Sequence, residues 1–249
     1  MRVQTVGYYH RDSEFNVTPD LLPRTLNPNR RFFDNPYRNP LPPVDLNINI
    51  PDSGAGELKM ESLLEYINLK GFPNDPPPQF VTNRQLLSTI AAYHDTELKI
   101  VVFRFSGVIF MWKLSTNPTW HTNFEAVFEN FWTEGVDTDG TVRKGVFLAE
   151  IPSKRGCNDS FSVLYSGEID AIDDSGDHFE LKVFFNGMND YFWKAHSCRV
   201  YWQASLGNVK TLVIGARTGK FPNDPKTRPP SSRCLPENSV YKVNIRHSL

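Results

Sequence analysis

The pattern of apolar and polar residues predicts β-strands through much of the middle and C-terminal parts of the chain. Two segments, residues 161–172 and 178–185, show the two-residue alternation of a half-buried strand most clearly. The short polar segment 173–177 joins them and predicts a turn. Further strands are expected at residues 98–105, 108–114, 145–151, 209–215 and 239–245.

Other segments repeat their apolar residues at helical spacing. Helices are expected at residues 57–69, 79–93, 123–133 and 191–204. Helices and strands that alternate along the chain favour a mixed α+β fold. We therefore expect a single domain with a central mixed β-sheet flanked by helices.

The first 60 residues differ in composition from the rest. Eight prolines lie between Pro19 and Pro51, where they disfavour helices and central strands. Aromatic residues occur throughout this stretch, so we interpret residues 1–60 as an irregular arm, with at most a short strand, packed on the domain. Residues 61–249 then form the main domain, and the whole chain is one globular unit.

Composition narrows the class of protein. The 249 residues carry a formal net charge of −1, which excludes a wholly basic nucleic-acid binder. Three cysteines without paired spacing indicate neither a zinc module nor a disulfide framework. No 18-residue apolar run and no apolar leader occur, and neither a GxxxxGK nor a Rossmann glycine pattern is present. We expect a nuclear or cytoplasmic protein that is not secreted, without a membrane segment or an organic cofactor.

Two pairs of charged residues carry the candidate chemistry. Glu168 and Asp170 are two residues apart near the end of one predicted strand, and Glu180 and Lys182 are two apart on the next. Side chains two apart share a face of a strand, and neighbouring strands lie about 4.8 Å apart, so these four charges are expected to converge. Carboxylate oxygens at that density are typical ligands of a divalent cation. The alternative is a solvated hairpin face with a cross-strand Lys–Glu pair.

The order of these residues resembles the core signature of the PD-(D/E)xK nucleases, in which an acidic residue precedes a Glu-x-Lys strand. The surrounding segments resemble the DXO family of RNA decapping nucleases more closely. Matching segments are Ser166-Gly167-Glu168-Ile169-Asp170, Glu180-Leu181-Lys182, Val81-Thr82-Asn83-Arg84, Phe103-Arg104-Phe105-Ser106-Gly107, Phe128-Glu129 and Arg199–Arg217. These segments occur in the same order as in the family.

The resemblance implies a set of site residues and a cofactor. One or two Mg²⁺ or Mn²⁺ ions would be held by Glu129, Glu168, Asp170, Glu180 and the carbonyl of Leu181. Catalysis would depend on Asp170, Glu180, Lys182 and Gln203, with Lys182 and Gln203 also contacting the scissile phosphate. The other substrate-binding positions would be Arg84, which holds the RNA backbone, and Arg31, Asn83, Gln85 and Glu65.

By this resemblance the protein is a metal-dependent hydrolase of RNA 5′ ends. It would remove incomplete or atypical caps (unmethylated guanosine, NAD or triphosphate) and degrade RNA 5′→3′ in RNA quality control. RNA 5′ ends are thus the expected partner, and a protein partner is unknown. Residues 194–233 carry eight Lys or Arg and one acid, which favours binding of a phosphate backbone.

Two other hypotheses stay open. The family has a glycine where this chain has Glu125, and relatives continue further than Leu249. Both departures favour, as the alternative, a catalytically weakened paralogue that regulates by binding RNA or a partner protein. A DNA nuclease that shares only the PD-(D/E)xK core is the third hypothesis.

Overall fold

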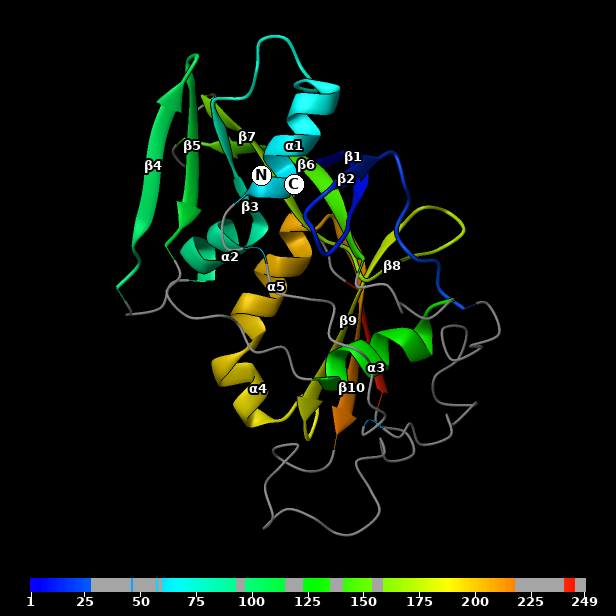
Figure 1. The fold of residues 1–249 in the computed structure, drawn as a ribbon. Coiled ribbons are helices and arrows are strands. Elements are labelled where there is room, and N and C mark those ends of the chain that lie inside the picture. Colours follow the sequence, from blue (N-terminus) through cyan, green and yellow to red (C-terminus); the bar gives the residue numbers. More distant parts are fainter. Residues whose placement is uncertain are drawn as a thin grey trace.

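The computed structural model describes residues 1–27, 46, 57, 60–92, 97–114, 123–134, 141–153, 159–217 and 240–244. These residues form an α+β fold in which the strands are divided between two sheets (Figure 1). The α+β class, with a mixed β-sheet flanked by helices, is confirmed.

The larger sheet has seven strands. Their spatial order is β2 (Val17–Pro19), β1 (Arg2–Arg11), β6 (Val142–Pro152), β7 (Ser160–Glu168), β3 (Phe80–Asn83), β5 (Val108–Lys113) and β4 (Ile100–Phe105). Helix α1 (Glu61–Lys70) packs on one face, where Leu63 joins a core with Val146 and Leu164. Side chains of the opposite face, such as Phe147 and Tyr165, pack toward the second sheet through Ile172 and Leu206.

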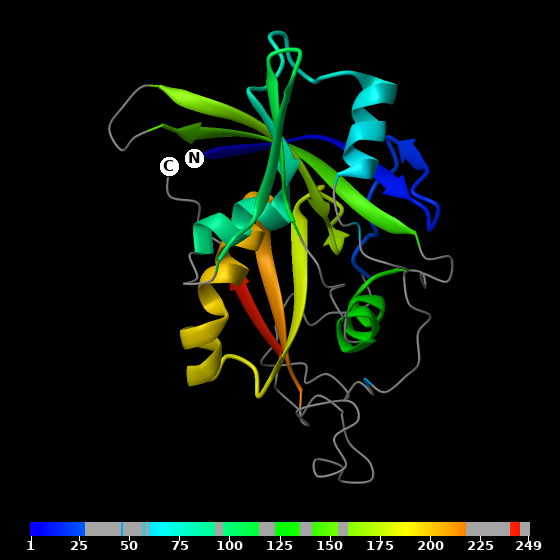
Figure 2. The same ribbon diagram turned by 60° about the vertical axis from the view of Figure 1, so that its left-hand side comes forward.

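The smaller sheet has four strands, in the order β11 (Val240–Asn244), β10 (Val209–Arg217), β9 (His178–Phe185) and β8 (Ala171–Ile172). Strands β9 and β10 are parallel, and β8 and β11 pair with them antiparallel. Helix α3 (Asn123–Trp132) covers one face, and α4 (Asp190–Ala195) and α5 (Ser197–Leu206) cover the other, as Figure 2 shows.

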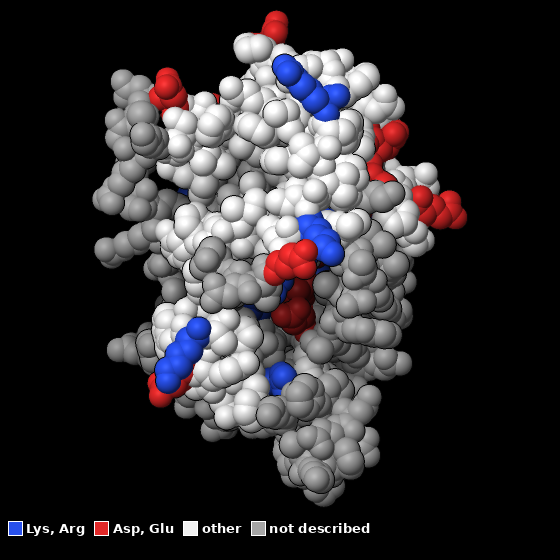
Figure 3. Space-filling model, turned by 90° about the vertical axis from the view of Figure 1, so that its left-hand side faces the viewer, with Lys and Arg blue, Asp and Glu red and all other residues white. Residues whose placement is uncertain are grey.

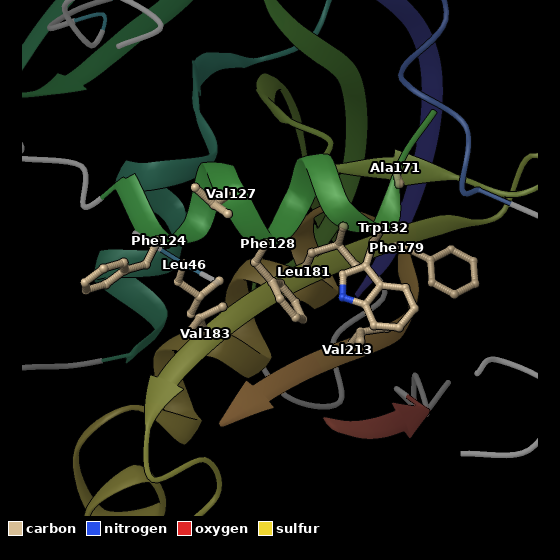
Figure 4. Packing of buried hydrophobic residues seen from close by; sticks show 10 residues of the cluster. All are labelled: Leu46, Phe124, Val127, Phe128, Trp132, Ala171, Phe179, Leu181, Val183 and Val213. Carbon is tan, nitrogen blue, oxygen red and sulfur yellow. The ribbon is translucent and has the colours of Figure 1, made fainter. Parts of the chain in front are cut away.

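Alternation along β9 explains why this sheet is covered on both faces. Leu181 and Val183 pack against Phe124, Val127 and Phe128 of α3 (Figure 4). Phe184, on the opposite face of the strand, contacts Phe192 of α4. The charged residues Glu180 and Lys182 share the face of Phe184, so they lie on the side of α4 and α5.

Several predicted elements differ from the structure. The helix expected at 191–204 consists of two helices, α4 and α5, with His196 between them. The helix expected at 79–93 begins as strand β3, and helix α2 (Arg84–Ala92) starts only after it. The strand expected at 161–172 ends at Glu168, and only Ala171 and Ile172 pair with β9. Strand β7 instead pairs with β6 and β3. The apolar Ile169 is buried where the chain leaves one sheet for the other. The apolar pattern therefore continues past the end of β7, and the sequence does not show where that strand ends.

The N-terminal stretch is more regular than its prolines indicate. Strand β1 is ten residues long, far longer than the short strand expected, and pairs with β6 along most of its length. All residues of β1 precede the first proline. The proline content of residues 1–60 therefore says nothing about this strand, and the prediction based on it was wrong here. Further on, Thr25 forms a parallel bridge with Ile172 and covers the outer edge of β8. The boundary placed at residue 60 stays a prediction.

Candidate active site

Three charged residues meet where the chain entering β8 lies against the middle of β9. The ammonium of Lys182 lies 3.0 Å from Glu180 Oε1 and 3.6 Å from Asp170 Oδ2. Asp170 Oδ2 also accepts a 2.7 Å hydrogen bond from the backbone N–H of Leu181. Glu180 is 1% exposed and Asp170 is 8% exposed, so both carboxylates face Lys182 in a largely dry environment. The predicted convergence of these three residues is therefore present.

Arg84 contacts the carboxylate of Glu180 from the end of a strand of the larger sheet. It is the first residue of α2, directly after β3, and its Nη1 lies 3.2 Å from Glu180 Oε2. Asn83 fixes the start of this helix, because its Oδ1 accepts a 2.8 Å hydrogen bond from the N–H of Leu86. The position of Arg84 thus follows from a strand, a cap and a helix that lie next to one another in the chain.

Two glycines leave the space that Arg84 occupies. A Cβ on Gly167 would lie 2.6 Å from Arg84 Nε, and a Cβ on Gly207 would lie 2.7 Å from its Nη1. Real Cβ atoms do not approach so closely, so any larger residue would displace the guanidinium. The sequence shows Gly167 within the motif at residues 166–170 but does not indicate this role for it. Gly207 could not be predicted, because a lone glycine before a strand has no distinctive pattern.

Glu129 enters from α3. Its Oε2 lies 3.6 Å from Arg24 Nη2, a residue of the N-terminal segment that the sequence did not mark as functional. Burial, the charge of Asp170 and the charge of the nearby Glu125 raise the pKa of Glu129 well above its usual value. The positive charges of Lys182 and Arg24 act in the opposite direction, but they do not outweigh these effects. The carboxylate of Glu129 therefore shares an electrostatic environment with Asp170 and Lys182.

The remaining pKa shifts show how tightly the charges interact. Burial, with the charge of Glu180, raises the pKa of Asp170 to about 6, although Lys182 opposes this. Burial also opposes ionisation of Glu180, but Lys182 and Arg84 outweigh it and lower the pKa of Glu180. Burial disfavours the Lys182 ammonium, yet Asp170 and Glu180 outweigh it and hold the pKa of Lys182 well above its usual range. Lys182 and Glu180 thus stay charged at neutral pH.

This cluster has features that suit a divalent cation. Glu180 Oε1 is buried and accepts no hydrogen bond from the described residues, although the Lys182 ammonium forms an ion pair with it. This oxygen therefore has a lone pair that a cation could use. Glu129 and Asp170 both have raised pKa values, which a nearby cation would reverse. Within the described ranges, however, no three Asp, Glu, His or Cys side chains stand close enough together to hold a metal as they are.

Other predicted site residues lie around the cluster or apart from it. Glu168 is exposed at the end of β7, where its charge helps to raise the pKa values of Arg84 and Lys144. The expectation that Glu168 and Asp170 share one strand is wrong, because the strand ends between them. Gln203 is half-buried on α5, Gln85 is exposed on α2 and Glu65 is exposed on α1. Arg31 lies outside the described residues.

One face of the molecule is hollowed (Figure 3). Figure 3 shows Asp and Glu atoms on the floor of a hollow on the face that lies at the left of Figure 1, with Lys or Arg atoms beside them. Acidic groups on the floor of a hollow attract a cation and repel an anion. No helix in the described part of the chain is long and apolar enough to span a membrane.

The structure brings Asp170, Glu180 and Lys182 together on a mixed sheet, in the order that the PD-(D/E)xK signature describes. Comparison with known proteins is more specific. No family model matches the chain. The decapping nuclease dom-3 of Caenorhabditis elegans is 26% identical over 225 residues, which cover 73% of this chain and 57% of that protein. The chain therefore matches little more than half the length of this curated relative.

Solved structures share the fold. Rai1 of S. pombe, in complex with 3′-FADP, has a TM-score of 0.68 at 16% identity, covering 98% of this chain and 75% of that one. Dxo1 of K. lactis, in complex with manganese, has a TM-score of 0.64 at 14% identity, with 98% and 69% covered. Rai1 of Candida albicans, in complex with pU5 and Mn²⁺, has a TM-score of 0.63 at 16% identity, with 98% and 72% covered. These comparisons confirm the resemblance to the DXO family that the sequence motifs indicate.

Proposed function

We propose that the protein is a divalent-metal-dependent hydrolase that acts on RNA 5′ ends. Its reactions would be removal of incomplete or atypical caps (unmethylated guanosine, NAD or triphosphate) and 5′→3′ degradation, in RNA quality control in the nucleus or cytoplasm. The observation that carries this proposal is the buried group of Asp170, Glu180, Lys182 and Arg84, in which both carboxylates face an ammonium. The manganese and pU5 bound by the related Dxo1 and Rai1 structures support the same ligands here.

Mg²⁺ or Mn²⁺ would be held by Asp170 and Glu180, with Glu129, Glu168 and the Leu181 carbonyl completing the ligand set. A bound cation of this kind lowers the pKa of water and neutralises charge on the leaving oxygen. Lys182, which the surrounding carboxylates keep protonated, would stabilise the negative charge that develops on the phosphate. Asp170, whose pKa in the metal-free protein is raised to about 6, is ionised at neutral pH and would therefore be available as a metal ligand.

The substrate would be held from the opposite side of the cluster. The guanidinium of Arg84 is held by its ion pair with Glu180 and fits the space that Gly167 and Gly207 leave. From this position it would bind the RNA backbone. Gln203 would contact the scissile phosphate and the water. Asn83, Gln85, Glu65 and Arg31 stay predictions as further substrate contacts.

The alternative is a catalytically weakened paralogue that binds RNA or a partner protein. Glu125 favours it, because this carboxylate stands where the family has glycine. Its charge acts on both Glu129 and Lys182 in the structure. An additional negative charge beside the cluster would weaken attraction of a phosphate.

Nucleotide release from 5′-monophosphorylated RNA, with Mn²⁺ or with EDTA, tests the proposal in the wild type and in Glu180→Gln. We expect Mn²⁺-dependent turnover that Glu180→Gln lowers at least ~10²-fold, because one acidic ligand is lost, with RNA affinity changed only a few-fold. Arg104→Gln, on the exposed edge strand β4, is the control and should behave as the wild type. Absence of turnover in a wild type that binds the RNA would overturn the hydrolase and favour the regulator.

A further inference from the structure

The direction of α5 follows from contacts at its two ends. After its last turn, the carbonyl of Gly207 accepts a 2.8 Å hydrogen bond from His178, at the start of β9. Before its first turn, the His196 ring lies 5.3 Å from that of Phe184, near the end of β9. Helix α5 therefore runs antiparallel to β9.

One side of α5 carries a row of polar residues. Residues three or four apart lie on the same side of a helix, so His196, Arg199 and Gln203 form a stripe. Val200 and Ala204 are buried on the adjacent side, toward β10. The stripe spans seven residues, or about 10 Å of helix. On β9, Lys182 and Phe184 share the face that turns toward it.

The stripe leads away from the charged cluster toward aromatic residues. Gln203 stands at the end near Gly207, a position that borders Arg84 Nη1, and His196 stands at the far end, between Phe184 and Tyr191. The Tyr191 ring lies 5.2 Å from that of His196, and Tyr191 is 66% exposed. Its ring therefore presents a large part of its surface to solvent beside the last position of the stripe.

The charge of this stretch suits a polyanion. Residues 191–206 contain no Asp or Glu, and they include Lys194 and Arg199, which are both exposed. Arg199 forms no ion pair with any described residue, so its guanidinium is not neutralised within that part of the chain. Partial burial and the charge of Arg199 lower the pKa of His196, so its ring is neutral at pH 7 and offers a stacking surface.

We propose that His196, Arg199 and Tyr191 form a track for single-stranded RNA, which carries the nucleotides that follow the scissile bond away from the site. Arg199 would contact a phosphate, and the exposed Tyr191 ring, beside the half-buried His196 ring, would stack on an unpaired base. About three stacked nucleotides, at roughly 3.4 Å each, match the length of the stripe. A paired strand has its bases occupied and cannot use the rings. The inference rests on the proposed function, since it assumes that the 5′ end lies at Asp170 and Glu180.

Length-dependent binding tests this track without turnover. The probes are 5′-monophosphorylated uridine oligomers of two and ten nucleotides, measured in EDTA by fluorescence anisotropy for the dimer in competition and the decamer directly. The variants are Arg199→Ala and Tyr191→Ala. Matched controls are Arg104→Ala on β4, and Tyr201→Ala on a different side of α5.

We expect the wild type to bind the decamer at least about tenfold more tightly than the dimer. Tyr191→Ala should weaken the decamer by about five- to 100-fold, the range of one stacked base. Arg199→Ala should also weaken the decamer, and both variants should leave the dimer within twofold. Arg199→Ala should also lower the dependence of decamer affinity on salt by about one ion, and Arg199→Lys should restore it. Both control variants should bind as the wild type.

Two results would overturn the track. The first is a decamer bound equally well by wild type, Arg199→Ala and Tyr191→Ala. The second is an equal loss for dimer and decamer, which would place these residues at the 5′ end itself. Failure of the proposed function has a different signature: the wild type then releases no nucleotide with Mn²⁺, while the length-dependent loss of decamer binding in the track variants still supports the track.

Discussion

At the scale of single residues, the site depends on how Arg84 and Asp170 are held. Arg84 is 8% exposed and fits between two glycines, so its position is set by the space they leave as much as by Glu180. Asp170 is equally buried and is held by the Leu181 N–H and by Lys182. Each arrangement leads to a prediction about one substitution.

Gly167→Ala should weaken binding of RNA and destabilise the fold. The added methyl group would lie within 3 Å of three side-chain atoms of Arg84, so the guanidinium must move away from Glu180. We expect a rise in KM of about tenfold and a free energy of unfolding lowered by roughly 1–3 kcal/mol. Gly176→Ala is a control for the loss of a glycine, because nothing lies near a Cβ there, although its φ of 77° adds a cost of its own. An unchanged KM in Gly167→Ala would contradict the steric account.

Asp170→Asn should stabilise the metal-free fold at higher pH while abolishing activity. Burial raises the pKa of Asp170 to about 6 in the native state, and an unfolded aspartate titrates at about 4. The native state therefore binds the proton more tightly, and its stability falls as pH rises through 6. Urea unfolding in EDTA should show that the advantage of Asp170→Asn grows by about 1 kcal/mol between pH 5 and pH 8. An advantage that does not change with pH would contradict the shift.

At the scale of secondary-structure elements, the junction of β3 and α2 places Arg84. The expected helix at 79–93 missed this junction, because Val81 fits the apolar pattern of a helix and of a strand equally. The Asn83 side chain was the available signal, since asparagine favours helix N-caps. Segments with one clear period, such as 123–133 and 209–215, were predicted almost to their ends.

Asn83→Ala should shift the start of α2. Loss of the hydrogen bond to the Leu86 N–H is expected to cost about 1 kcal/mol of unfolding free energy. Asn83→Ser keeps an acceptor at the cap and serves as the control, expected within about 0.5 kcal/mol of the wild type. Because Arg84 follows directly, RNA affinity should fall with stability in the alanine variant only. Equal stability of the two variants would show that the cap does not hold this helix.

At the scale of the whole molecule, the site forms where the two sheets meet. Arg84 follows a strand of the larger sheet, Glu180 and Lys182 belong to the smaller one, and Asp170 lies in the link between β7 and β8. The spacing of Asp170, Glu180 and Lys182 predicted the cluster even though the strand containing Asp170 was placed in the wrong pairing. Arg24 was beyond reach of the sequence, since only folding brings it to Glu129.

Turnover of defined RNA 5′ ends tests the central claim most directly. Monophosphorylated, triphosphorylated, guanosine-capped and NAD-capped RNA are incubated with Mg²⁺ or Mn²⁺ and either the wild type or Asp170→Ala, and the products are separated by mass. The proposed function predicts metal-dependent release of mononucleotides or cap fragments by the wild type alone. Intact RNA with all four ends in the wild type, although the RNA is bound, would contradict it.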